Sequence, residues 1–272
     1  MSKKYIVQLI CWSLLLPAVC NCTVLEDRAP CPGYLDIDYR QLPNALPDGG
    51  PGGTVEVAWL SDAVRWTVRH ALSDCPSAEE VPVEKTQARA VAVVHANPQR
   101  TYLTEGTQIL CEPGSQIGIL YADAQDVDCS GEEACFVIQP HKQFSTLVFT
   151  DAGNDLFRQY DLLVRGTTCG FDAADLSALD GDYVCPAEDA DGTGRIAVRI
   201  PRQKQGDMVL EFWGREDRRK YLVSPVGRYL FAAGYDPSAP DLPDYEIRVD
   251  FREALLYLRV ADWDEEYLYS LY

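Results

Sequence analysis

Short segments in which apolar and polar residues alternate recur along this chain, and they constrain its fold more than any other feature. The clearest is Tyr245–Phe251, where Tyr, Ile, Val and Phe occupy every second position. A period of two predicts a strand with one buried and one exposed face. Turns rich in Pro and Gly separate these segments at intervals of about ten residues, a spacing typical of β-sandwiches. We therefore predict an all-β fold.

The same alternation places the first strand and its core residues. Residues 34–39 read Tyr-Leu-Asp-Ile-Asp-Tyr, so Leu35, Ile37 and Tyr39 are expected to face the core. Thr54–Trp59 alternates again and is predicted to be the partner of this strand.

Three later segments receive different interpretations. The acidic stretch Asp123–Glu133 is predicted to be a loop, and Tyr229–Ala232 a short strand. Leu255–Val260, directly after the strongest alternating segment, is predicted to continue that sheet.

The length and a break in the middle predict two domains. A chain of 272 residues, less an N-terminal signal, suits one large or two ordinary domains. Phe136–Ile138 followed by Pro140 marks a plausible boundary. We therefore predict domains over residues 22–137 and 138–272.

The N-terminus has the organisation of an export signal. Lys3 and Lys4 precede an apolar run from Tyr5 to Val19. A basic start and an apolar core of this length indicate a signal peptide, here residues 1–21. The run is interrupted by polar residues and is shorter than the roughly 20 residues that a membrane-spanning helix needs.

The apolar run ends on cysteine, where a secreted protein would carry a small-residue cleavage site. Bacterial lipoprotein signals end in this way, because the thiol receives diacylglyceryl and palmitoyl chains; ordinary secretion with an incidental cysteine is the alternative. We favour Cys22 over Cys20 as the lipidated residue. Glu26 and Asp27 then lie just beyond the anchor, where acidic residues resemble the surface-export signal of Bacteroidales-type lipoproteins. Several acyl chains would hold the protein stably at an outer membrane.

Ten cysteines are many for a reducing compartment, so disulfides are expected. If Cys22 is lipidated, the cysteines that follow it are Cys31, Cys75, Cys111, Cys129, Cys135, Cys169 and Cys185. Three disulfides and one odd thiol would result. Cys129 with Cys135, and Cys169 with Cys185, are closest in sequence, but sequence does not settle the pairing.

Neither composition nor motifs point to catalysis. The formal net charge of −18 argues against a nucleic-acid partner. No nucleophile elbow, phosphate loop or zinc-protease helix occurs in the sequence, and we expect no metal site and no cofactor beyond the covalent lipid. Glu188–Gly192 faintly resembles a calcium loop, but position twelve counted from Asp189 is Ile200, so an acidic turn is preferred.

The C-terminal tail is rich in Tyr and Leu, and it has two possible structures. It could be an exposed edge strand that pairs with another chain, or the last strand of its own sheet. The residues concerned are Trp263, Tyr267, Leu268, Tyr269, Leu271 and Tyr272.

Both ends of the chain resemble one family. Cys22, then Glu26-Asp27, then Cys31-Pro32 opening into the strand 35–39, resembles the start of FimB-type fimbrial anchor lipoproteins. The ending, Asp244–Asp250 followed by a further strand, is similar too. The resemblance implies two tandem transthyretin-like β-sandwich domains and a place in the type V pili of Bacteroidales-type bacteria.

What the resemblance implies for function is a non-enzymatic anchor. Shaft subunits of these pili polymerise by strand exchange after a protease removes an N-terminal strand. An anchor that stays lipidated sits at the base of the fimbria, limits its length and contacts the first shaft subunit. The alternative is a surface glycan-binding β-sandwich lipoprotein, which would also be acidic and rich in aromatic residues.

Overall fold

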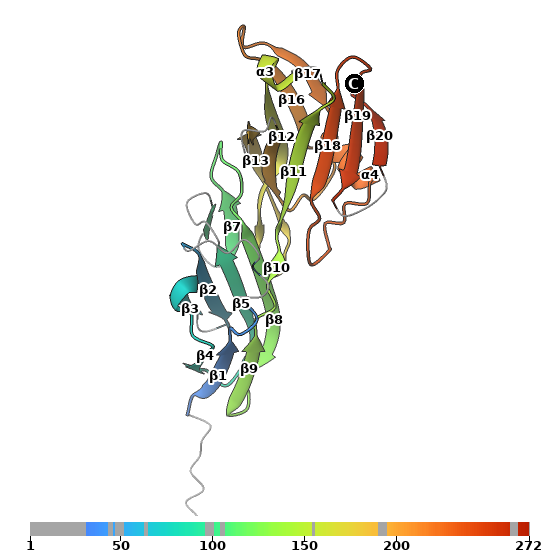
Figure 1. The fold of residues 1–272 in the computed structure, drawn as a ribbon. Coiled ribbons are helices and arrows are strands. Elements are labelled where there is room, and N and C mark those ends of the chain that lie inside the picture. Colours follow the sequence, from blue (N-terminus) through green and yellow to red (C-terminus); the bar gives the residue numbers. More distant parts are fainter. Residues whose placement is uncertain are drawn as a thin grey trace, which may run out of the picture. The chain divides into compact units, whose positions relative to one another are not determined.

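Strands account for most of the regular structure, as the alternation predicts. The structure is a computed structural model that describes residues 31–42, 46, 52–62, 65–95, 101–103, 107–153, 156–189, 195–261 and 266–271. The chain from Gly33 to Tyr272 forms one compact unit (Figure 1). Helical segments among the described residues are short: η1 (Leu72–Asp74), α3 (Leu156–Gln159) and α4 (Val226–Ala232).

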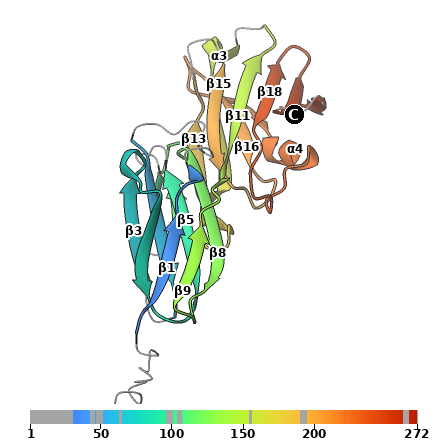
Figure 2. The ribbon, with the colours of Figure 1, turned by 60° about the horizontal axis from the view of Figure 1, so that its bottom comes forward.

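Two sheets in the first half of the chain share one core. A three-stranded sheet has the order β4–β1–β9, and a five-stranded sheet has the order β10–β8–β5–β2–β3. Their strands are β1 (Gly33–Asp38), β2 (Thr54–Leu60), β3 (Arg65–Ala71), β4 (Ala78–Val83), β5 (Gln87–His95), β8 (Leu120–Asp128), β9 (Glu133–Val137) and β10 (His141–Lys142). Leu35, Ile37 and Tyr39 are buried as predicted, in one cluster with Val57 and Ala92 of the larger sheet. Figure 2 shows β1, in blue, in front of the green β5.

Two six-stranded sheets form a second sandwich. Their orders are β14–β15–β11–β18–β19–β20 and β17–β16–β12–β7–β6, and β13 also pairs with β12. Their strands are β6 (Thr101–Leu103), β7 (Gln108–Cys111), β11 (Phe144–Asp151), β12 (Tyr160–Asp172), β13 (Ala178–Pro186), β14 (Glu188–Asp189), β15 (Ile196–Pro201), β16 (Val209–Gly214), β17 (Lys220–Ser224), β18 (Tyr245–Asp250), β19 (Leu255–Val260) and β20 (Glu266–Ser270). Buried residues of both sheets, among them Phe149 and Phe212, lie in one core cluster. The prediction of an all-β sandwich fold is confirmed.

The strands of the second sandwich do not all come from the second half of the chain. β7 precedes the predicted boundary at residue 137, yet it pairs with β12 through Gly170↔Leu110 and Phe171↔Ile109. The larger core cluster also includes Val91 of β5. The division into domains 22–137 and 138–272 therefore stays a prediction.

The predicted pairing of the first two strands is wrong. β1 lies between β4, to which it is antiparallel, and β9, to which it is parallel. β2 belongs to the facing sheet, between β3 and β5. Alternation fixes which face of a strand is buried, but it does not choose the neighbouring strand, so sequence order was a poor guide.

The acidic stretch predicted to be a loop is largely strand, since β8 runs through Asp128. Asp123 is buried within it, with only 7% of its surface exposed. Its carboxylate accepts hydrogen bonds from Gln125 Nε2, at 2.8 Å, and from the Gln139 amide, at 2.7 Å. These partners offset the desolvation that would otherwise exclude a carboxylate from the strand.

The segment Tyr229–Ala232 is part of helix α4 and not a strand. Val226 and Leu230, four residues apart, are buried on one side of the helix. The spacing of four was hidden in sequence by the neighbouring aromatic residues, which mimic a period of two.

Gly170 permits the close approach of β12 and β7. A Cβ added there would overlap the carbonyl oxygen of Ile109 and lie 3.0 Å from the Cα of Leu110. Because backbone atoms cannot move away as a side chain can, we expect Gly170→Ala to lower the free energy of unfolding by about 2–3 kcal/mol. Chemical denaturation measures this change.

Gly131→Ala is the matched control, since a Cβ at Gly131 would meet nothing within 4 Å. A stability loss of equal size in both variants would contradict the assigned β7–β12 contact.

Candidate functional site

The C-terminal strand β20 is the segment where a predicted site and the described structure coincide. β20 pairs antiparallel with β19, with Tyr257 opposite Leu268 and Leu256 opposite Tyr269. Tyr267 and Tyr269 face the core cluster, whereas Leu268 is 58% exposed. The tail is thus the last strand of its own sheet.

Helix α4 fixes the tail in this position. The rings of Tyr229 and Tyr269 stack with centroids 4.4 Å apart and planes at 8°. The Tyr229 hydroxyl donates a hydrogen bond to the Ser270 carbonyl at 2.7 Å. Leu271 is fully buried, and its amide donates to the Ala254 carbonyl at 2.8 Å. Burial raises the pKa of Tyr269, so this hydroxyl stays protonated at neutral pH.

The outer side of β20 is an edge that mixes apolar and charged residues. Within the described part of the chain, β20 pairs with β19 alone. Leu268 continues a row formed by Arg248 and Tyr257, whose guanidinium carbon and ring centroid are 4.1 Å apart. Arg248 also pairs with Glu266 at 3.4 Å. A strand edge bearing exposed apolar surface can accept a further strand.

The remaining predicted site residues are not described by the structure. Cys22, its alternative Cys20, the acidic pair Glu26-Asp27 and the tail residues Trp263 and Tyr272 all lie outside the described residues. Of the described helices, none has the length and apolar character needed to span a membrane.

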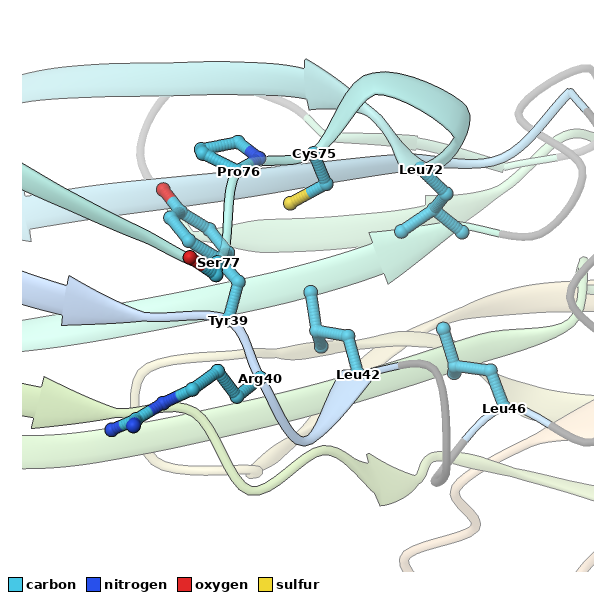
Figure 3. Close-up of a pocket in the computed structure, with 8 residues that line it drawn as sticks. All are labelled: Tyr39, Arg40, Leu42, Leu46, Leu72, Cys75, Pro76 and Ser77. Atoms are coloured by element: carbon cyan, nitrogen blue, oxygen red, sulfur yellow. The ribbon is translucent and has the colours of Figure 1, made fainter.

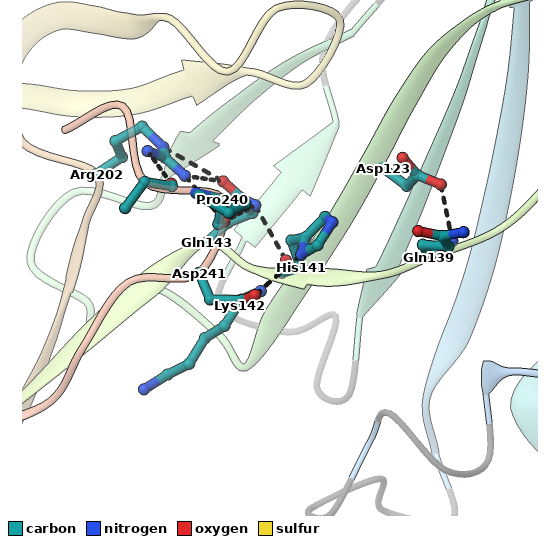
Figure 4. A network of polar contacts seen from close by, with 9 residues as sticks. Asp123, Gln139, His141, Lys142, Gln143, Arg202, Pro240 and Asp241 are labelled. Carbon is teal, nitrogen blue, oxygen red and sulfur yellow. Dashed lines mark hydrogen bonds and ion pairs between the residues drawn. The ribbon is translucent and has the colours of Figure 1, made fainter. Parts of the chain in front are cut away.

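Arg202 and Gln143 form a buried polar network that holds the segment before β18 (Figure 4). Arg202 is 1% exposed and donates to Gln143 Oε1 at 2.7 Å and to the Ala239 carbonyl at 2.9 Å. Nearby, Asp241 accepts a hydrogen bond from the Lys142 amide at 2.7 Å. The guanidinium is directed at acceptors of the protein itself, so this cation holds the fold together.

An apolar cavity of about 560 Å³ lies beside the end of β1 (Figure 3). Leu42, Leu72 and Cys75 are among its lining residues. Burial, helped by the charge of Glu79, raises the pKa of the Cys75 thiol to about 11. A thiol that stays protonated at neutral pH is a poor nucleophile.

A smaller cavity of about 360 Å³ lies at the turn between β16 and β17. It is lined by Arg158, Tyr160, Gly214, Arg215, Asp217 and Tyr221, among others. Sequence reasoning missed it. The charged run Arg215–Lys220 between two aromatic residues, Trp213 and Tyr221, was the signal that could have indicated it.

No disulfide joins the cysteines that the structure describes, and the pairs closest in sequence, Cys129 with Cys135 and Cys169 with Cys185, are not bonded in it. Cys129 lies in the first core cluster, whereas Cys135 is exposed on β9.

The segment Glu188–Gly192, which faintly resembles a calcium loop, begins with a strand. Its first two residues, Glu188 and Asp189, form β14, and its other residues lie outside the described ranges. Among the residues that the structure covers, no group of three or more His, Cys, Asp and Glu is placed to hold a metal ion.

Comparisons with known proteins place this fold. No family model matches the sequence, and no curated protein matches it either. Solved structures do match over nearly the whole chain. A candidate polysaccharide-binding protein from Bacteroides thetaiotaomicron aligns with a TM-score of 0.59 at 14% identity, covering 88% of this chain and 98% of that one.

Two further structures give similar values. A candidate adhesin from the same organism has a TM-score of 0.57 at 12% identity, covering 90% of this chain and 100% of its own. The fimbrial anchor protein Mfa2 from Porphyromonas gingivalis has a TM-score of 0.56 at 9% identity, covering 89% and 100%. At these identities the likeness establishes a shared fold.

The packing of the tail gives a direct test. Leu271 is fully buried, so Leu271→Ala should lower the free energy of unfolding by about 2–4 kcal/mol. Leu268→Ala removes the same atoms from an exposed site and should change it by less than about 0.5 kcal/mol. Denaturant titration of both variants measures the difference, and equal effects would show that the tail is not packed on its own sheet.

Proposed function

We propose that this protein is a non-enzymatic, lipid-anchored surface protein that tethers a fimbria to the outer membrane. The observation that carries the proposal is the fold shared with a fimbrial anchor protein. The alignment covers 89% of this chain and 100% of that protein. The likeness to a candidate adhesin over a comparable length supports the same surface location.

The membrane tether is proposed to be Cys22, with Cys20 as the alternative. Its thiol would carry the lipid, and Glu26 and Asp27 would direct export to the surface. The first described strand begins at Gly33, so about ten residues separate the proposed anchor from the folded unit. Fully extended, they would span on the order of 35 Å, which leaves the sandwiches room to stand clear of the lipid headgroups.

Contact with the first shaft subunit is proposed at β20 through strand pairing. Its outer edge and the exposed side chain of Leu268 would receive a strand of that subunit. Because Tyr229 and Leu271 hold β20 on its own sheet, it would act as a fixed template and not as a donated strand. Trp263 and Tyr272 are retained as candidate contacts at the two ends of the tail.

The tether is tested by the mass of the mature N-terminal peptide from membranes of the native host. We expect a peptide that starts at Cys22 and carries lipid mass. Cys22→Ala should move the protein from the membrane to the soluble fraction, because two or three acyl chains supply the membrane affinity. Cys20→Ala is the matched control; release by that variant alone would assign the lipid to Cys20, and an unmodified N-terminus would remove the anchor role.

The docking edge is tested by co-purification of shaft subunits with the full-length protein from the native host. Leu268→Lys places a charge on the proposed contact and should reduce the recovered shaft subunit at least about tenfold, since charged edges resist strand addition. Deletion of residues 265–272 should have at least the same effect.

Val223→Lys is the control for charge, because Val223 is a comparably exposed apolar residue, at 41%, on the edge strand β17 of the other sheet. Unchanged recovery after both Leu268→Lys and the deletion would sink the assignment of β20.

Glycan binding is a second candidate function. The likeness to a candidate polysaccharide-binding protein favours it, as does the cavity at the β16–β17 turn, where two tyrosines lie among charged side chains. An anchor and a glycan receptor are compatible roles, because β20 and β17 belong to different sheets.

A further inference from the structure

We propose that the cavity at the β16–β17 turn binds an uncharged, hydroxyl-rich saccharide. This inference deepens the second candidate function and rests on it, and it is independent of the proposed anchor role. Its support is the geometry of Tyr221, the backbone of the turn and the charge balance of the cavity.

Tyr221 presents a ring that is both exposed and fixed. Tyr221 is 58% exposed, yet its ring meets the Tyr160 ring edge to face, and the two ring centroids are 5.3 Å apart. Its hydroxyl donates a hydrogen bond to Asp217 Oδ2 at 2.7 Å. Tyr160 is itself held by stacking on Phe251 at 5.3 Å. A ring that is already immobilised loses little entropy on binding, and its open face suits the C–H groups of a sugar ring.

The backbone of the turn is shaped around this ring. A Cβ added at Gly214 would overlap Asp217 Oδ1 and lie 2.8 Å from Tyr221 Cε2, so a larger residue would displace these side chains from their present positions. The Gly214 amide donates to the Arg219 carbonyl at 2.8 Å, which closes the turn. Arg218 adopts a left-handed conformation with φ of 56°, which is unfavourable for a residue with a side chain. Strain of this kind persists where the surroundings fix it, and it is frequent at binding sites.

The charges that line the cavity balance. Arg158 and Arg215 contribute two positive charges, and Glu216 and Asp217 contribute two negative charges, which sum to zero. The lining therefore carries no net charge, although the whole chain carries a net charge of −18. The hydrogen bond from Tyr221 lowers the pKa of Asp217, which keeps this carboxylate ionised as an acceptor. Planar guanidinium donors beside carboxylate acceptors suit neighbouring hydroxyl groups, and the balanced charge favours neither an anion nor a cation.

The size of the cavity agrees with a small ligand. Its volume of about 360 Å³ is at the lower end of the range for small-molecule sites, and it opens beside the exposed Tyr221 ring. A terminal saccharide unit of a larger glycan would therefore enter it while the rest of the glycan remained in solvent.

The test is a glycan array probed with the full-length protein and its variants. The array carries neutral oligosaccharides beside sialylated and sulfated ones. We expect binding to neutral oligosaccharides and at least a tenfold loss of that binding in Tyr221→Ala, because the stacking face is removed. Tyr34→Ala is the matched control, since Tyr34 is also exposed, at 42%, but lies on β1. It should bind as the unaltered protein does.

A second variant separates binding from folding. Tyr221→Phe retains the ring and should retain most of the binding, whereas Gly214→Ala should lose it; thermal unfolding reports whether each variant is folded. The proposal is overturned if the unaltered protein binds no neutral glycan, if acidic glycans are preferred, or if folded Tyr221→Ala binds normally. Failure here leaves shaft-subunit recovery unaffected, so it is distinguishable from failure of the anchor role.

Discussion

The pairing of β12 with three other strands is the constraint on which the rest of the structure depends. This strand of 13 residues pairs with β16 near its start, with β13 along most of its length and with β7 at its end. It thereby connects a strand from the first half of the chain to the second sandwich. The approach at Gly170 is so close that a side chain would meet the backbone of β7. The absence of a side chain at Gly170 therefore allows residues 108–111 to lie this close to β12.

On the other sheet of the second sandwich, the buried guanidinium of Arg202 fixes the segment that leads into β18. β11 and β18 are parallel neighbours, and a parallel pair needs a long connecting segment. Arg202 and Gln143 hold the final part of that segment through its carbonyl groups, so that the chain enters β18 in register. A guanidinium suits this role because its several donors can satisfy carbonyl oxygens that would otherwise be buried without partners.

The second sandwich presents two surfaces of different chemistry. The edge at β20 offers backbone hydrogen-bonding groups beside Leu268, which suits a peptide strand. The cavity at the β16–β17 turn offers a fixed tyrosine ring among balanced charges, which suits a hydroxylated ligand. The two lie on different sheets. The two proposed contacts, one with a fimbrial subunit and one with a glycan, would therefore not compete for the same surface.

The sequence by itself determined the class of fold and the burial of individual strands. Leu35 and Ile37 face the core as alternation requires, because successive side chains of a strand point to opposite faces. The segments Tyr245–Asp250 and Leu255–Val260 were also predicted to be strands of one sheet, and they pair with each other. Sequence also indicated the Tyr- and Leu-rich tail, and left open whether it packs on its own sheet.

Tertiary structure alone decided what depends on distant partners. Asp123 is accommodated in a strand because the amide of Gln139, which follows β9, donates to its carboxylate. β1 pairs with β4 and β9 and not with β2. The tail is self-packed because Tyr229, some forty residues earlier, stacks on Tyr269. The cavity at the β16–β17 turn exists because the turn brings Tyr221 against Tyr160. Local periodicity indicates which face of a strand is buried. Contacts between residues far apart in sequence determine which strands lie next to it, and the binding surfaces are formed where such strands and turns meet.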